Sequence, residues 1–423
     1  MSEPGPGPSA ALRRRAGRAG GALVDQVLSS GSGLLLFVLV AREADPATFG
    51  ALSVAVIVHG FLLGVVRAAV GDVVLLRCRR PDAHARPEAA VGLFLAGAAG
   101  LAATAGLLLV GAALGGTVGE LLAIVALAAP FVYAQDLLRS VAYGAGRVHD
   151  AIALDGTWLG VQAVASAALL AAGAASPTAL MLAWAAGAVA SAVGGSLLAR
   201  LRPRRASLAR WWREERARAA GFVGDFLVST GLVQAAFLLL GAVLPLDEFG
   251  ALRVAFVSLS PLANLLAGVR TMTLAHLAGL RPHPLGARRR SGELSVAFAA
   301  AGAVYGAVLV AVPTAWGGQV FGESWAAAAE LVGIVAVGEA LRLGTFSAID
   351  LVKVLGSPLD LVRTRAAATT GVVAGLLAGA ATGGPRGAAV LAAAGYALAA
   401  VLWWRRATMV AMAVAQQVPT ARS

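Results

Sequence analysis

The sequence predicts an all-α polytopic membrane protein with about twelve transmembrane helices in two parallel-repeat six-helix bundles. Three observations support this fold class. Of the 423 residues, 59% are hydrophobic and 13% are charged, whereas a soluble domain carries roughly 25% charged residues. Apolar runs of about 20 residues, long enough to cross a hydrocarbon core about 30 Å thick, recur along the whole chain. Parts of the first half also return about 200 residues later.

Each apolar run defines one expected helix. The first run follows a Pro/Gly-rich and basic segment and is long for the apolar core of a signal peptide. We therefore interpret it as an uncleaved transmembrane helix. The expected helices cover approximately residues 22–41, 49–76, 89–114, 118–140, 151–173, 178–199, 221–244, 249–280, 293–315, 326–350, 365–382 and 387–408.

The charge of the connecting loops alternates along the chain. Basic segments, such as 77–88 and 281–290, alternate with loops that are acidic or carry few cations, such as 42–46 and 316–325. Lysine and arginine collect in the cytoplasmic loops of membrane proteins. The pattern therefore predicts a multi-pass protein of the cytoplasmic (inner) cell membrane with both termini in the cytoplasm.

The same pattern divides the chain into five parts. The central basic segment "SLARWWREERARAAGF" has the composition of an amphipathic helix on the inner leaflet. The expected parts are a cytoplasmic disordered basic tail (1–20), an N-terminal six-helix bundle (21–199), a basic amphipathic cytoplasmic linker (200–220), a C-terminal six-helix bundle (221–410) and a cytoplasmic tail (411–423).

Composition also disfavours several classes of function. The net charge of +12 comes from arginines gathered in short loops between apolar runs, so we expect no nucleic-acid partner. Cys78 is the single cysteine, which excludes a disulfide within the chain and suggests no metal cluster. The phosphate-binding motif G-x-x-x-x-G-K-[ST] is absent from the sequence. We therefore expect no cofactor and no ATP-driven step.

An internal repeat organises the two halves. The stretch "FGAL" occurs at 49–52 and again at 249–252, and the same shift of 200 residues aligns Asp25 with Asp225. Six helices separate the copies, so the copies have the same orientation and are related by an axis along the membrane normal. Transporters place their substrate between such repeats and rock one half against the other. The repeat therefore indicates a transporter rather than an enzyme.

Further charged residues align at a shift of 203 residues. The aligned pairs are Arg67 with Arg270, Asp136 with Glu339, and Arg139 with Arg342. The change of shift requires about three extra residues in the eighth helix. Pro261 and Asn264 predict a kink or a loosened turn there.

These motifs carry a resemblance to a known family. A helix that opens with Asp25 and Ser29, a short loop that ends in Phe49-Gly50, and their second-half copies resemble the polysaccharide exporter family of the multidrug/oligosaccharidyl-lipid/polysaccharide (MOP) superfamily. The resemblance implies a flippase that moves a polyprenyl-(pyro)phosphate-linked oligosaccharide from the inner to the outer leaflet by alternating access, through a cationic cavity. It also implies lipid-linked glycan and membrane lipids as partners, with a glycan polymerase or glycosyltransferases in the same pathway.

Four arginines are candidates for substrate binding, namely Arg67, Arg270, Arg139 and Arg342. Guanidinium groups match phosphate oxygens in geometry and charge. If Arg67 and Arg270 line a cavity between the halves, neutralising both stops glycan export without unfolding the protein. The alternative for this pair is snorkelling toward inner-leaflet head groups. Arg139 and Arg342 each follow an acid by three residues, so structural ion pairs explain them as well.

Four acids are candidates for gating or coupling, namely Asp25, Asp225, Asp136 and Glu339. Asp25 and Asp225 open their apolar runs, where they compensate a helix dipole or close a cytoplasmic gate with Arg67 and Arg270. Glu339 lies near mid-depth of its span, where it binds a proton or positions an arginine.

Three other functions compete with the flippase. A cation-coupled multidrug exporter of the same superfamily needs an apolar or acidic cavity, which the internal arginines disfavour. A membrane glycosyltransferase usually carries a long outer loop, and every outer loop here is short. A transport-inactive scaffold in an envelope-assembly complex has no sequence signature that separates it from a flippase.

Overall fold

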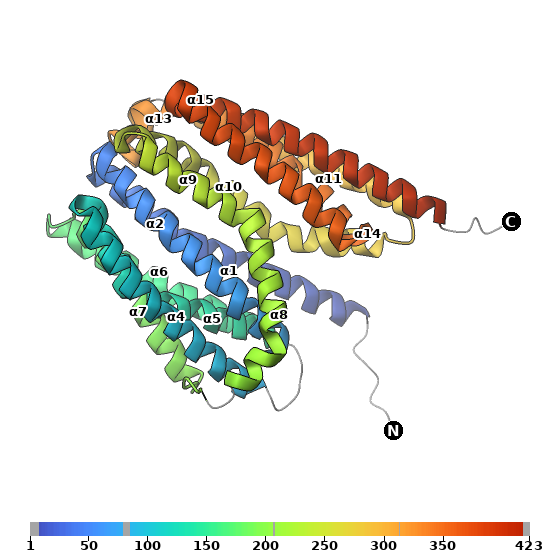
Figure 1. Ribbon diagram of the computed structural model, residues 1–423, viewed down its shortest axis with the longest axis horizontal. Coiled ribbons are helices and arrows are strands. Elements are labelled where there is room, and N and C mark those ends of the chain that lie inside the picture. Colours follow the sequence, from blue (N-terminus) through green and yellow to red (C-terminus); the bar gives the residue numbers. More distant parts are fainter. Residues whose placement is uncertain (1–7, 79–84, 206–207, 313, 418–423) are drawn as a thin grey trace.

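The fold is helical throughout the described part of the chain. The computed structural model describes residues 8–78, 85–205, 208–312 and 314–417, and every element in these ranges is a helix (Figure 1). Large apolar side chains such as Leu109 and Leu198 are exposed on the outer surface, as in helices that face lipid. A buried cluster that includes Phe49 and Phe249 joins the two halves.

The first half contains six spans. Its elements are α1 (Pro8–Glu43), α2 (Pro46–Val66), the π-helical turn η1 (Arg67–Gly71), α3 (Asp72–Cys78), α4 (Ala85–Leu114), α5 (Gly116–Gly144), α6 (Val148–Ala171) and α7 (Pro177–Leu198). The second half consists of α8 (Leu208–Phe226), the π-helical turn η2 (Leu227–Gly231), α9 (Leu232–Val243), α10 (Leu246–Gly279), α11 (Pro284–Ala311), α12 (Thr314–Phe321), α13 (Ser324–Gly344), α14 (Phe346–Leu355) and α15 (Pro358–Gln417).

The number of spans agrees with the sequence. Ten stretches of the described residues are long and apolar enough to cross a membrane. One of them, α15, holds two spans because its helical geometry breaks at Gly383 and Gly384, where Gly384 has a φ of 56°. The remaining expected span, 326–350, coincides with α13 and the start of α14. The prediction of about twelve helices in a multi-pass membrane protein is therefore confirmed.

The two FGAL stretches bring the halves together. At Gly50, an added Cβ would overlap the backbone of Leu246, and at Gly250 it would overlap the backbone of Pro46. Each glycine thus admits the first turn of the other half's helix, so α2 and α10 lie in close contact. We call this end of the molecule the FGAL end.

The turn before α2 is fixed by a helix cap. Asp45 accepts hydrogen bonds from the Thr48 backbone N–H at 2.9 Å and from the Thr48 hydroxyl at 2.8 Å. These bonds, the backbone one first, hold the pKa of Asp45 below its ordinary value. Pro46 follows in the first turn, where its missing N–H costs nothing. The cap sets where α2 begins relative to α10.

The halves separate away from the FGAL end. Figure 1 shows α4–α7 and α11–α15 spreading apart toward the end where the described parts of both termini lie. We call this the basic end, because the arginine-rich segments lie there in the predicted topology. Helix α8 bridges the halves at this end: it packs on α3 and η1, and Arg77 forms an ion pair with Glu214 at 2.9 Å. On the predicted topology this arrangement faces the cytoplasm.

Three boundaries differ from the sequence expectation. Residues 8–20, expected in a disordered tail, are helical, because alanine, leucine and arginine are strong helix formers. Residues 208–220 of the expected surface linker join the seventh span through η2 and bury Trp211 against the first half. Residues 411–417 extend the last helix. Residues 1–7 and 418–423 of the expected tails lie outside the described residues.

The eighth span contains the proline at which the sequence predicts a kink, and two π-helical distortions lie in other spans. Helix α10 runs from Leu246 to Gly279 as one element that contains Pro261. The π-helical turns in the described residues are η1 and η2, at Arg67–Gly71 and Leu227–Gly231. A π-helical turn inserts one extra residue into a helix, and such turns are frequent at functional sites.

The close contact at the FGAL end gives a first prediction. The double change Gly50→Ala with Gly250→Ala is expected to separate α2 from α10, because each new methyl group would overlap backbone atoms. The separation is measured by spin labels on cysteines at positions 47 and 247 in a Cys78→Ser background.

The expected result is a longer mean label distance than in the parent protein. Gly97→Ala is the control, because a Cβ at Gly97 meets no atom within 4 Å. An unchanged distance in the double variant would show that the glycines do not set the approach of the two helices.

Candidate functional site

All candidate site residues except Asp25 line two cavities, one in each half. The first-half cavity has a volume of about 200 Å³, and the second-half cavity a volume of about 680 Å³. Arg67, Arg139 and Asp136 line the first, and Arg270 and Arg342 line the second. The sequence predicts one arginine-lined cavity between the halves, which stays a prediction; in the structure these residues line a cavity within each half.

A buried ion-pair network surrounds Arg139 in the first half. Its guanidinium donates to Asp25 at 2.9 Å and lies 3.0 Å from Asp155, while Asp136 is 3.9 Å away. The hydroxyl of Tyr143 also donates to Asp25. All three carboxylates are buried. Arg139 is therefore the cation that compensates three acids from three helices, α1, α5 and α6.

Arg67 completes this network from the π-helical turn η1. Its Nε lies 3.0 Å from both carboxylate oxygens of Asp136, so the contact is a forked ion pair. Gly71 ends the turn close to Ser140 of α5, so η1 approaches α5 closely. The expected pair Asp136–Arg139 is thus the weaker of two contacts that Asp136 makes, and Arg67 is its main partner.

In the second half, two arginines share one aromatic ring. Arg342 donates to Glu339 at 2.7 Å and 2.5 Å, which is the pair expected from their spacing. Arg270 donates to Asp350 at 2.8 Å. The guanidinium carbons of Arg270 and Arg342 lie 4.4 Å and 5.3 Å from the centre of the Phe346 ring. Cation–π contact with Phe346 helps to hold both guanidinium groups in place.

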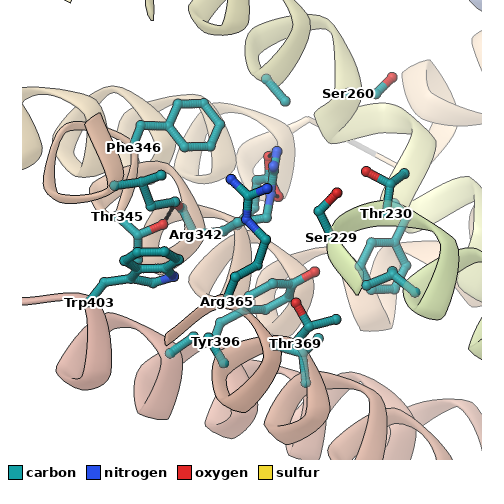
Figure 2. A pocket seen from close by; sticks show the side chains of 18 of the residues that line it. Ser229, Thr230, Ser260, Arg342, Thr345, Phe346, Arg365, Thr369, Tyr396 and Trp403 are labelled. Carbon is teal, nitrogen blue, oxygen red and sulfur yellow. Dashed lines mark hydrogen bonds and ion pairs between the residues drawn. The ribbon is translucent and has the colours of Figure 1, made fainter. Parts of the chain in front are cut away.

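Arg365 forms another ion pair in this cavity. It extends from α15 toward Ser229 and Thr230 (Figure 2) and donates to Asp225 at the end of α8. Asp225 is thus bound to Arg365, and Asp25 is bound to Arg139 and Tyr143. In this arrangement neither acid pairs with Arg67 or Arg270, the partners expected for a closed cytoplasmic gate.

The structure also removes one explanation for the two acids. Asp25 lies well inside α1, which begins at Pro8, and Asp225 lies near the end of α8, which begins at Leu208. A helix dipole acts within the first turn. Compensation of a helix N-terminus, which the sequence allowed for both acids, is therefore wrong.

The two cavities differ in charge. Two arginines and two acids line the first, with Asp25 adding a third acid through Arg139, whereas four arginines and two acids line the second, with Asp350 adding a third acid through Arg270. The fifth and eleventh spans, which correspond in the repeat, account for part of the difference. The fifth span contributes Asp155 to the lining of the first cavity, and the eleventh contributes Arg365 to the lining of the second. Two matched repeats therefore hold opposite local charge balances.

Sequence reasoning missed four charged residues of these sites, Asp155, Asp350, Arg253 and Arg365. Asp155 was detectable as a lone acid in an apolar span, and Arg253 as the residue directly after the second "FGAL". No group of three or more His, Cys, Asp or Glu side chains in the described ranges could hold a metal ion.

Comparison with known proteins places the fold. No protein-family model and no curated protein sequence matches the chain. A multidrug resistance MATE transporter of the MOP superfamily, solved in an inward-facing conformation, superposes with a TM-score of 0.69 at 14% identity, over 94% of this chain and 96% of the other. The lipid II flippase MurJ superposes with a TM-score of 0.68 at 10% identity, over 93% and 90%.

A third solved structure is a MOP-superfamily transporter from Pyrococcus furiosus, described as having a binding pocket of reversed polarity. It superposes with a TM-score of 0.59 at 13% identity, over 96% of this chain and 97% of the other. The chain therefore has the fold shared by the MATE transporters and MurJ, which the sequence resemblance predicted at the level of the superfamily.

Proposed function

We propose that this protein is a membrane transporter that flips a polyprenyl-(pyro)phosphate-linked oligosaccharide from the inner to the outer leaflet. The observation that carries the proposal is the second-half cavity, lined by four arginines against two acids. A volume of about 680 Å³ lies within the range of ligand pockets, roughly 300–1,000 Å³. The lipid tail then remains in the bilayer while the polar head occupies the cavity.

The arginines of this cavity suit a phosphate group. Glu339 and Phe346 hold Arg342 from two sides, and Asp350 and Phe346 hold Arg270. A guanidinium carries five N–H donors, and its acid partner uses only some of them. Two cations held in place bind a pyrophosphate with little loss of conformational entropy. The acids then position the arginines for the substrate.

The remaining lining suits sugars. Hydroxyl groups of Ser229, Thr230 and Thr369 and the rings of Tyr396 and Trp403 face the same cavity (Figure 2). Hydroxyls hydrogen-bond to sugar hydroxyls, and flat aromatic faces pack against the apolar faces of sugar rings. The cavity thus combines binding groups for both parts of a glycosyl phosphate head.

We assign the first-half network to gating or coupling. Asp25, Asp136 and Asp155 hold Arg139 and Arg67 with little free charge for an anionic substrate. Alternating access requires these ion pairs, and Asp225–Arg365 in the second half, to exchange partners as the basic end closes. Glycosyltransferases and a glycan polymerase then act on the same lipid-linked glycan before and after the flip.

The second candidate function is cation-coupled multidrug export. It is favoured by the excess of acid in the first-half network and by the MATE transporters among the similar folds. A cationic drug would have to bind near Asp25 or Asp136, and both carboxylates already have arginine partners.

A reconstituted system tests the proposed function. Proteoliposomes receive a fluorescent polyprenyl-pyrophosphate-linked oligosaccharide, and flipping is followed by the fraction protected from an added fluorescence quencher. The expected result is protein-dependent flipping of this lipid and no uptake of a cationic dye under a proton or sodium gradient. Dye uptake without lipid flipping would replace the flippase with the exporter.

A further inference from the structure

We infer that Arg253 forms a separate oxyanion-binding site at the FGAL end of the second-half cavity. The inference rests on the proposed function for its transport role, but the site itself is defined by the residues around it. Arg253 is the second residue beyond Ala251 in "FGALR", seven residues after the start of α10. At 1.5 Å per residue it lies about 25 Å along α10 from Arg270.

Arg253 is a cation without an acid partner among the described residues. It lines the cavity, and its Nε is buried and makes no hydrogen bond. The two acids that line the cavity are used elsewhere, Asp225 by Arg365 and Glu339 by Arg342. The side chain as a whole is half-buried, and a charge without a counter-ion is costly in a membrane-spanning helix. The missing counter-ion is therefore supplied by a ligand.

An aromatic pair surrounds the guanidinium. Arg253 lies over the ring of Phe237 at 5.0 Å, and the rings of Phe237 and Phe256 are 5.1 Å apart at 83°. These rings hold the guanidinium plane and exclude water from one side of it. In such a low-dielectric setting a charge-assisted hydrogen bond to an anion is stronger than in water.

The internal repeat shows that the fold does not require this arginine. The shift of 200 residues aligns "FGALS" with "FGALR", so Ser53 is the first-half counterpart of Arg253. Ser53 is fully buried at the matching place in α2. The cation thus belongs to the second-half cavity in particular. Its ligand is an oxyanion such as a phosphate or pyrophosphate, free or attached to a polyprenyl chain.

The position defines a role in transport. Arg270 and Arg365 bind the head group toward the basic end, and Arg253 receives it toward the FGAL end. On the predicted topology this is the direction from the cytoplasm to the outer leaflet. Arg270 and Arg253, both on α10, then bind the phosphate one after the other as it moves through the half of the membrane that faces outward.

Binding of anions to purified protein in nanodiscs tests the site. The probes are inorganic pyrophosphate and farnesyl pyrophosphate, measured by isothermal titration against the parent protein, Arg253→Ser and Arg253→Lys. Arg253→Ser copies the first-half residue and removes an uncompensated charge, so the variant is expected to fold. We expect at least a tenfold loss of affinity in Arg253→Ser and a smaller loss in Arg253→Lys. The control is Arg386→Ser, an exposed arginine in the turn of α15.

The outcomes separate this site from the proposed function. Equal affinity in the parent protein and Arg253→Ser, or no binding of either probe to the parent, overturns the site. Loss of affinity for both probes supports the site. If only inorganic pyrophosphate depends on Arg253, the oxyanion site stands while the lipid-linked substrate fails. If Arg253→Ser does not fold, Arg253→Lys and Arg253→Gln replace it in the test. An affinity of Arg253→Gln equal to that of the parent protein overturns the site. Weaker binding by Arg253→Gln than by Arg253→Lys supports the site.

Discussion

Arg139→Gln is expected to lower the free energy of unfolding by about 3–5 kcal/mol, as removal of one partner from a buried ion pair typically does. Arg139 is the shared partner of Asp25 and Asp155, and both carboxylates are buried. Without the guanidinium these acids keep their negative charges without compensation, or take up protons. Three helices, α1, α5 and α6, lose their common contact.

Thermal unfolding of the purified protein in mild detergent measures this effect as a change in melting temperature. Arg147→Gln is the matched control, because its pair with Asp150 is exposed and an exposed pair contributes about 0–1 kcal/mol. The triple change Arg139→Gln, Asp25→Asn, Asp155→Asn is expected to recover part of the stability. Equal melting temperatures for Arg139→Gln and Arg147→Gln would contradict the role of Arg139 as the centre of the network.

The paired change Glu339→Gln with Arg342→Gln is expected to reduce flipping of the lipid-linked oligosaccharide at least tenfold while the protein stays folded. Removing both partners leaves no uncompensated charge, so stability changes little. The substrate phosphate, however, loses a hydrogen bond to a charged donor, worth about 1.5–3 kcal/mol, or roughly a factor of 10 to 100. The proteoliposome assay measures the initial flipping rate.

The control for this change is Arg289→Gln with Glu293→Gln. Glu293 pairs with Arg289 at 3.3 Å and with Arg290 at 2.7 Å, and these pairs lie on the exposed face of α11 outside the second-half cavity. The flipping rate of this control should equal that of the parent protein. If Glu339→Gln/Arg342→Gln flips the lipid-linked oligosaccharide at the rate of the parent protein, Arg342 is not part of the substrate site.

The fold was largely predictable because it depends on patterns that a sequence states directly. Apolar length, loop charge and the 200-residue repeat indicated the spans, whereas the contact between the halves at Gly50 and Gly250 came only from the structure. The spacing of Glu339 and Arg342 predicted their ion pair, since neighbours three residues apart share a helix face.

The partners of the other arginines were not predictable in this way. Asp155 and Asp350 lie on other helices from the arginines they bind, so only tertiary packing brings the pairs together. Arg67 begins a π-helical turn, and nothing in "VVRAAVG" marks that turn. The start of α1 at Pro8 was also hidden, because basic residues at a terminus resemble a flexible tail.

The central claim is that an anionic head group occupies the second-half cavity. A cryo-electron microscopy structure of the protein in nanodiscs with a polyprenyl-pyrophosphate-linked oligosaccharide tests it most directly. We predict density for the pyrophosphate in this cavity, within hydrogen-bond distance of Arg342, Arg270 or Arg365, with sugar density beside Tyr396 and Trp403. Density for the head group in the first-half cavity, or an empty second-half cavity at saturating lipid, would contradict the account.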